Sequence, residues 1–139
     1  MENLKYTTNK SVAVEFELSE PEIWQDKSRM KIIINNLLSN ALIFQKHFVD
    51  HKPFIKVVSK KQGNDLLIQI EDNGIGIRPE QKDKIFKMFY RGNEQSLGSG
   101  LGLYIAREAT LKIRGNLSVR SEFGKGSTFV VQVKDLAES

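Results

Sequence analysis

The sequence has no cysteine among its 139 residues. This absence excludes disulfide bonds, thiolate metal sites and a small secreted fold held together by disulfides. Long apolar runs are also missing, because none approaches the roughly 20 residues that a membrane-spanning helix needs. The first residues, 1–5, lack the apolar core of a signal peptide. We therefore expect a soluble cytoplasmic domain, although a longer parent protein could carry a membrane anchor.

Length and composition indicate one globular domain over residues 1–139. A chain of this size buries roughly 70% of its unfolded surface and folds without disulfides. Hydrophobic residues make up 40% and charged residues 27%, which is typical of soluble proteins. The net charge of +4 comes from 21 basic and 17 acidic residues, so it predicts a solvated surface or a mild attraction for an anion. The basic residues follow no recognition motif, and we expect no nucleic-acid partner and no membrane contact.

Hydrophobic periodicity predicts the order strand, long helix, two strands, short helix, loop, helix and two strands. Alternating apolar residues predict a strand over 12–19, and Asp26 suits the N-cap of a helix over 27–48. The buried face of this helix is predicted by residues at helical spacing, which are Ile33, Leu37, Ala41, Phe44 and Phe48. Similar patterns predict the other elements at 54–59, 65–70, 78–87, 101–113, 116–121 and 128–133.

The connections between these elements predict the fold class. Residues 60–64 form a hairpin loop, Pro79 suits the first turn of the short helix, and Gly115 suits the end of the helix over 101–113. Residues 92–100 are glycine-rich and polar, which is typical of a loop. Strands joined mostly as hairpins, with about three helices on one face, predict an α/β (α+β) two-layer sandwich with a mixed, mainly antiparallel sheet.

Two asparagines lie one turn apart on the long predicted helix. Asn36 and Asn40 share one side of that helix, where asparagine is unfavourable unless its amide has partners. Their neutral amide oxygens suit Mg²⁺, which keeps most of its waters and takes other oxygens from phosphates. The alternative is a pair of solvent-facing asparagines.

Two glycine-containing segments could form the rest of a binding site. Asp72 can accept a hydrogen bond from an exocyclic amine, and the glycines after it let the backbone approach a flat base, unless the segment is an ordinary turn. Gly98–Gly102 opens a helix whose free amides can bind phosphate, unless it is a flexible linker.

Aromatic and basic residues lie just before the second glycine segment. Phe86 and Phe89 either pack on the core or act as the hinge of a lid over the nucleotide. Arg91 either donates hydrogen bonds to the terminal phosphates or is a surface residue.

Five segments in this order resemble the motifs of the ATP-binding catalytic domain of sensor histidine kinases, in the GHKL superfamily. They are the N box at Asn36–Ala41, the G1 box at Asp72–Gly76, the F box at Phe86–Phe89, the G2 box at Gly98–Leu103 and the final glycine box at Gly124–Phe129. The resemblance covers nearly the whole chain and implies the α/β sandwich of the Bergerat ATP-binding fold. As in that family, the Walker A lysine loop and the catalytic motifs of serine/threonine kinases are absent.

The resemblance implies roles in binding ATP and Mg²⁺. Asn40 would coordinate Mg²⁺ with the assistance of Asn36. Asp72 would accept the adenine amine, helped by Thr128 through water, and Phe44 would lie against the base or ribose. The other residues that the resemblance places at the base, the phosphates or, for Arg91, the γ-phosphate are Gly74, Gly76, Gly98, Gly100, Leu101, Gly102 and Arg91.

Two positions depart from the family pattern. Ile43 stands where many relatives have a basic residue that helps to bind phosphate, and Asn36 stands where ATP-hydrolysing members have a glutamate base. Without that base we expect no fast hydrolysis. The resemblance implies transfer of the γ-phosphoryl group to a histidine on a separate dimerisation domain of the same parent protein. A histidine outside this domain is needed because neither His47 nor His51 has the setting of a phosphoacceptor. A response regulator would be an indirect partner. The alternatives are an ATPase of the same superfamily, a serine kinase and a scaffold without nucleotide.

Overall fold

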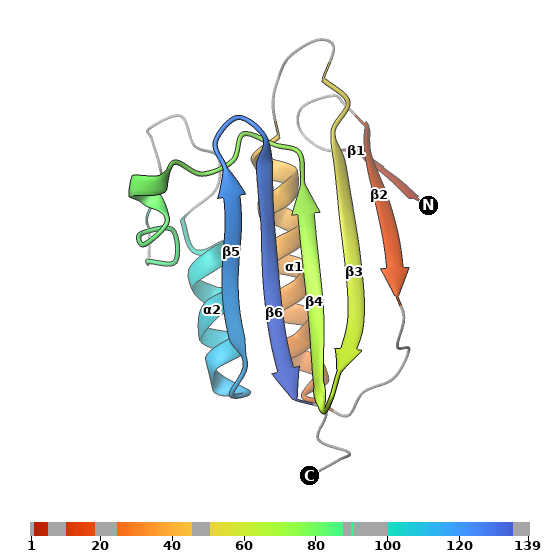
Figure 1. Ribbon diagram of the computed structural model, residues 1–139, viewed down its shortest axis with the longest axis vertical. Helices are drawn as coiled ribbons and strands as arrows, with labels where there is room; N and C mark the ends of the chain where they lie inside the picture. The colour runs from red at the N-terminus through yellow and green to blue at the C-terminus, as the bar shows by residue number, and fades with distance from the viewer. Residues whose placement is uncertain are drawn as a thin grey trace.

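The computed structural model describes residues 2–5, 11–18, 25–45, 51–87, 90 and 100–134, and it has two layers. One layer is a six-stranded sheet in the order β1-β2-β3-β4-β6-β5. Both α-helices lie behind one face of this sheet (Figure 1). The elements are β1 (Glu2–Lys5), β2 (Ser11–Leu18), α1 (Lys27–Ile43), β3 (Phe54–Gln62), β4 (Asp65–Asp72), the 3₁₀ helix η1 (Pro79–Gln81), α2 (Gly102–Lys112), β5 (Asn116–Glu122) and β6 (Gly126–Lys134).

The strand directions make the sheet mixed and mainly antiparallel. β2 and β3 run parallel, and the other neighbouring pairs are antiparallel. The connection between β2 and β3 contains α1, as a parallel pair requires. The predicted two-layer α/β fold is confirmed. The described residues contain two α-helices and one short 3₁₀ helix in place of three full helices, and β1 was not predicted because Glu2–Lys5 has no alternating pattern.

The core fills the space between α1 and the sheet. Ile33, Leu37 and Ala41 of α1 are almost fully buried, as their spacing predicted. They belong to one cluster with alternate residues of the central strands, which are Ile55, Val57, Leu66, Ile68, Ile70, Phe129, Val131 and Val133. Because buried apolar surface contributes roughly 25 cal/mol per Å², this shared core is the main interaction that fixes α1 against the sheet.

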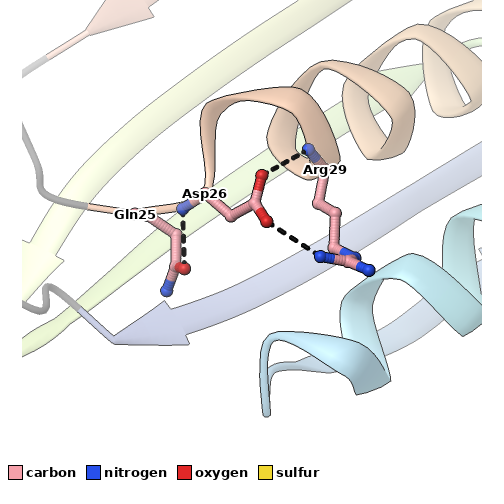
Figure 2. A network of polar contacts seen from close by, with 3 residues as sticks. All are labelled: Gln25, Asp26 and Arg29. Atoms are coloured by element: carbon pink, nitrogen blue, oxygen red, sulfur yellow. Dashed lines mark hydrogen bonds and ion pairs between the residues drawn. The ribbon is translucent and has the colours of Figure 1, made fainter.

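The helix α1 begins and ends at its observed residues for different reasons. At the start, Asp26 Oδ1 accepts the Arg29 N–H at 3.0 Å, and Oδ2 pairs with the Arg29 guanidinium at 2.9 Å (Figure 2). The hydrogen bond from the Arg29 amide lowers the pKa of Asp26, and the predicted N-cap is confirmed. The helix ends at Ile43, before its predicted end at 48, because Phe44 leaves the helical conformation. Phe48 lies outside the described residues.

The end of α2 differs from the prediction in the residue that makes the turn. Arg114, and not Gly115, has a left-handed conformation, with φ of 59°. The Gly115 amide donates to Thr110 O at 2.9 Å and the Arg114 amide donates to Leu111 O at 3.0 Å, which is the pattern of a Schellman motif. Gly115 is required for close approach, because a Cβ there would lie 2.8 Å from Gln132 O of β6.

Two other connections are tighter than predicted. β3 continues to Gln62, beyond its predicted end at 59, and β4 begins at Asp65 as predicted, so a turn at residues 63–64 replaces the predicted loop over 60–64. Pro79 begins the short helix as predicted, but only Pro79–Gln81 is helical, and turns follow it.

None of the helices in the described ranges combines the length and the apolar character that a membrane span requires.

Candidate functional site

Asp72 is a buried carboxylate at the end of β4. Its exposed fraction is 6%, and its Oδ1 accepts the Gly74 N–H at 2.8 Å. Burial raises the pKa of Asp72 to about 6, although amide hydrogen bonds from Gly74 and Ser127 favour the charged form. A donor on a ligand could replace the hydration that burial removes from this carboxylate. The shifted pKa and the burial together make Asp72 a candidate binding residue.

Gly74 joins the loop after β4 to the last turn of α1. A Cβ at this position would lie 2.1 Å from Phe44 O, so only glycine allows the two backbones to come this close. The same carbonyl accepts the Ile75 N–H at 3.0 Å. Phe44 itself is the half-buried C-cap of α1, and its N–H donates to Asn40 O at 3.1 Å. Asp72 is therefore held beside the end of the helix that carries the two asparagines.

The turn between β5 and β6 closes the other side of the same loop. Gly124 N–H donates to Ile75 O at 2.7 Å. Gly76 has φ of 75°, and a Cβ there would lie 2.3 Å from Glu122 O. Gly126 has φ of 135°, and a Cβ there would lie 2.1 Å from Asp72 O. The loop that follows Asp72 is thus packed between α1 and this turn.

Asn36 lies against the first residue of α2. Its Nδ2 donates to Ile32 O at 2.7 Å, so the amide nitrogen is turned back along α1 and the amide oxygen is the other end of the side chain. A Cβ on Gly102 would lie 3.5 Å from Asn36 Oδ1, so this oxygen is directed towards the start of α2. Asn40 is also half-buried and lies one turn further along α1, towards Asp72.

The start of α2 presents backbone amides of the kind that can bind an anion. Leu101 is its N-cap and makes no capping hydrogen bond with its side chain. The first amides of any helix lack intrahelical partners, and the positive end of the helix dipole favours an anion there. Gly100, with φ of 79°, precedes this helix start. Amide oxygens and amide N–H groups therefore meet where α1 and α2 come together.

The sheet register changes one predicted assignment. Thr128 pairs with Glu71, whereas Ser127 pairs with Asp72. Because successive residues of a strand point to opposite faces, Thr128 lies on the face away from Asp72, and Ser127 shares the face of Asp72. Ser127 is buried, with an exposed fraction of 8%. The expected help from Thr128 is therefore not what the structure supports, and Ser127 is the neighbour that sequence reasoning missed.

Ser121 is a second residue that sequence reasoning missed. Its hydroxyl contacts Ser127 Oγ at 2.8 Å and also bonds the loop that follows Gly76. Serine is ordinary in a strand, so no signal in the sequence marked this position. Only the pairing of β5 with β6 places the two serines side by side.

The predicted residues Phe89, Arg91 and Gly98 lie outside the described residues. Phe86 is described, and its ring meets that of Phe129 edge-on, with centroids 6.2 Å apart. The Arg107 guanidinium lies 6.0 Å from the centroid of the Phe86 ring. Phe86 thus packs on the core, which agrees with the first of its two interpretations.

Comparison with known proteins identifies the family. The sequence profile of the histidine kinase-, DNA gyrase B-, and HSP90-like ATPases matches residues 25–137. The sensor histidine kinase RppB of Synechocystis sp. is 38% identical over 123 residues, which cover 84% of this chain and 26% of that kinase. The aerobic respiration control sensor protein ArcB of Escherichia coli is 33% identical in an alignment 144 positions long, which covers 96% of this chain and 18% of that protein.

The chain therefore spans about a quarter or a fifth of these two relatives. Its fold is similar to that of the mycobacterial sensor histidine kinase MprB, with a TM-score of 0.75 at 23% identity over 88% of this chain and 81% of that one. The profile match covers most of the chain, including every element that positions Asp72, Asn36 and the start of α2. The chain belongs to the histidine kinase-, DNA gyrase B-, and HSP90-like ATPase family, as an ATP-binding catalytic domain of the sensor histidine kinase type.

Proposed function

We propose that this domain binds ATP with Mg²⁺ and transfers the γ-phosphoryl group to a histidine on a separate dimerisation domain of the same parent protein. A response regulator would receive the group next. The observation that carries the proposal is that α1 contacts both polar parts of the site, the loop after Asp72 and the start of α2. The C-terminal end of α1 contacts the loop after Asp72, and Asn36 lies against the start of α2. One nucleotide can therefore lie along α1, with its base at Asp72 and its phosphates at α2.

Asp72 suits the adenine end of that nucleotide. Its carboxylate accepts hydrogen bonds, and the 6-amino group of adenine donates them. We assign Phe44 to the base or ribose, and Gly74 and Gly76 to the backbone that lies against the base. Ser127 replaces Thr128 as the residue that assists Asp72, because it shares the face of Asp72.

Amide oxygens and helix amides suit the phosphate end. We assign Asn40 as a ligand of Mg²⁺ and Asn36 as its assistant, since neutral hard oxygens fit this ion and Asn36 Oδ1 is free of the hydrogen bond made by its Nδ2. Bound Mg²⁺ would neutralise charge on the phosphates. Backbone groups of Gly100, Leu101 and Gly102 would hold the phosphates, with the assigned contacts of Gly98 and Arg91 resting on the sequence motifs.

The chemistry assigned to this domain is mainly positioning and charge neutralisation. A neutral imidazole nitrogen forms a bond to the γ-phosphorus, the bond to the β,γ-bridging oxygen breaks, ADP leaves, and the other imidazole nitrogen gives its proton to solvent. Asn36 and Asn40 cannot act as a general base towards water, which favours transfer over hydrolysis. Because the reaction consumes ATP, we place the domain in the cytoplasm.

A phosphotransfer assay tests this function. The domain, γ-labelled ATP and Mg²⁺ should label a separately expressed histidine domain of the parent protein, and the label should be acid-labile. The domain alone should not label itself. Asn40→Ala should lower the transfer rate about 10–100-fold, because it removes a proposed Mg²⁺ ligand. Asn35→Ala, at an exposed asparagine of the same helix, should leave the rate unchanged.

Other outcomes would support the alternatives. An acid-stable, alkali-labile label on a protein would indicate a serine kinase. Steady phosphate release that depends on Asn36 or Asn40 would indicate an ATPase. A folded domain that binds no nucleotide would contradict the proposal and indicate a scaffold, with Ile43 in place of the basic residue as the first position to examine.

A further inference from the structure

The Ser121 hydroxyl lies at the junction of three backbone segments. Ile77 N–H donates to Ser121 Oγ at 2.8 Å, and Ser121 Oγ donates to Gly126 O at 2.9 Å. Ser127 Oγ lies 2.8 Å from Ser121 Oγ. These bonds join the loop that follows Gly76 to β5 and β6, and Ser127 is the register partner of Asp72. Ser127 already assists Asp72 in the proposed site, but none of the roles assigned above uses the Ser121 hydroxyl.

Proton counting fixes the direction of the bond between the two serines. A serine hydroxyl has one hydrogen and two lone pairs. An amide N–H can only donate and a carbonyl can only accept, so Ser121 accepts from Ile77 and gives its single hydrogen to Gly126 O. Ser121 therefore has only a lone pair left for Ser127. The hydrogen of Ser127 must point at Ser121, and Ser127 Oγ faces its other neighbours as an acceptor.

With this direction of the serine–serine bond, both side chains at the site around Asp72 act as hydrogen-bond acceptors. The Asp72 carboxylate is an acceptor when charged, and Ser127 on the same face is also restricted to accepting. Two acceptors suit the two hydrogens of a 6-amino group, either directly or through water. They do not suit the oxygen of a 6-oxo purine, which is itself an acceptor, and a mismatched polar pair at a buried site costs binding energy.

We propose that Ser121 is a positioning residue that makes the site select 6-amino over 6-oxo purine nucleotides, by holding Ser127 as an acceptor. The inference rests on the proposed ATP site and adds a specificity determinant to it. Without the Ser121 hydroxyl, the hydrogen of Ser127 is free to turn towards Asp72 or towards a 6-oxo group. Both arrangements reduce the preference for the amino group.

The test compares the dissociation constants of ATP and inosine triphosphate, which has a 6-oxo group, for the wild-type domain and variants. Ser121→Ala should lower the preference for ATP about tenfold, which is the size of one neutral hydrogen bond. Ser121→Thr keeps the hydroxyl and should restore the preference. Ser118→Ala, at an exposed serine of the same strand, should leave it unchanged.

The ratio of the two constants separates specificity from simple loosening of the loop. Loss of the Ile77 hydrogen bond alone would weaken both nucleotides equally and leave the ratio at its wild-type value. That result would overturn the inference while the proposed function stands. If the wild-type domain bound neither nucleotide, the proposed function would fail first.

Discussion

Asp72→Asn should stabilise the unliganded domain at neutral pH and weaken ATP binding at the same time. The cause of the stabilisation is the pKa of Asp72, which burial raises from its ordinary value of 3.8 to about 6. Between these two values the folded state binds more protons than the unfolded state. The free energy of unfolding therefore falls as the pH rises through this window, and above about pH 6 the full cost of the buried charge is present.

Asparagine removes that charge and keeps an amide oxygen that can accept the Gly74 N–H. The free energy of unfolding of Asp72→Asn should exceed that of the wild type by about 1–3 kcal/mol at about pH 7.5. Urea unfolding across pH 4–8 measures this difference, and the gap between the two proteins should close towards pH 4. Glu71→Gln, which removes an exposed carboxylate from the same strand, should change stability by less than about 0.5 kcal/mol.

The same substitution should weaken ATP binding about 10–100-fold, because a hydrogen bond to a charged group contributes about 1.5–3 kcal/mol. Titration with a fluorescent ATP analogue measures the affinity, and circular dichroism checks that the variant is folded. A variant that is less stable than the wild type at every pH, or that binds ATP with wild-type affinity, would show that Asp72 has a structural role only.

Gly126→Ala should destabilise the fold more than any other single substitution considered for the loop around Asp72. The position has φ of 135°, and the new Cβ would lie 2.1 Å from Asp72 O and 2.9 Å from Asn73 Cα. These are backbone atoms of the last residue of β4 and of the residue after it, and Asp72 cannot move aside without breaking the pairing of β4 with β6. We expect a loss of at least about 3 kcal/mol in the free energy of unfolding.

Gly124→Ala is the matched control for this prediction. Gly124 belongs to the same turn and also has a positive φ, of 90°, but a Cβ there meets no atom within 4 Å. Only the backbone strain remains, and we expect a loss of about 1 kcal/mol. Urea unfolding of both variants gives the comparison. Equal losses would show that the strain of a positive φ, and not the contact with Asp72, explains the requirement for glycine at 126.

Local chemistry explains which features could be predicted from the sequence. Asp26 predicted the start of α1 correctly, because its own side chain makes the capping bond. The end of the helix could not be predicted, because Phe44 is held by Ile75 and Gly74, which are distant in the sequence. The predicted hairpin loop was too long for a similar reason, since the pairing of β3 with β4 continues through polar residues that carry no strand pattern.

Some residues of the candidate site could be predicted from the sequence, and others could not. Asp72, Gly74 and Asn36 were chosen from motifs, and the structure places all three on elements that contact α1 or α2. The sequence prediction named only Thr128 and did not consider Ser127, because the register between β4 and β6 was not known. A shift of one residue in that register reverses the face of every side chain. The role of Ser121 required hydrogen-bond geometry that composition and spacing do not contain.

The central claim is that one nucleotide contacts both the loop after Asp72 and the start of α2. Amide NMR measures this directly, in a titration of the domain with a non-hydrolysable ATP analogue and Mg²⁺. We predict that the amides of Gly74, Gly76 and Gly102 shift with one common saturation curve, while that of Gly63, in the turn between β3 and β4, stays in place. Shifts confined to one of the two segments, or two different saturation curves, would contradict a single site.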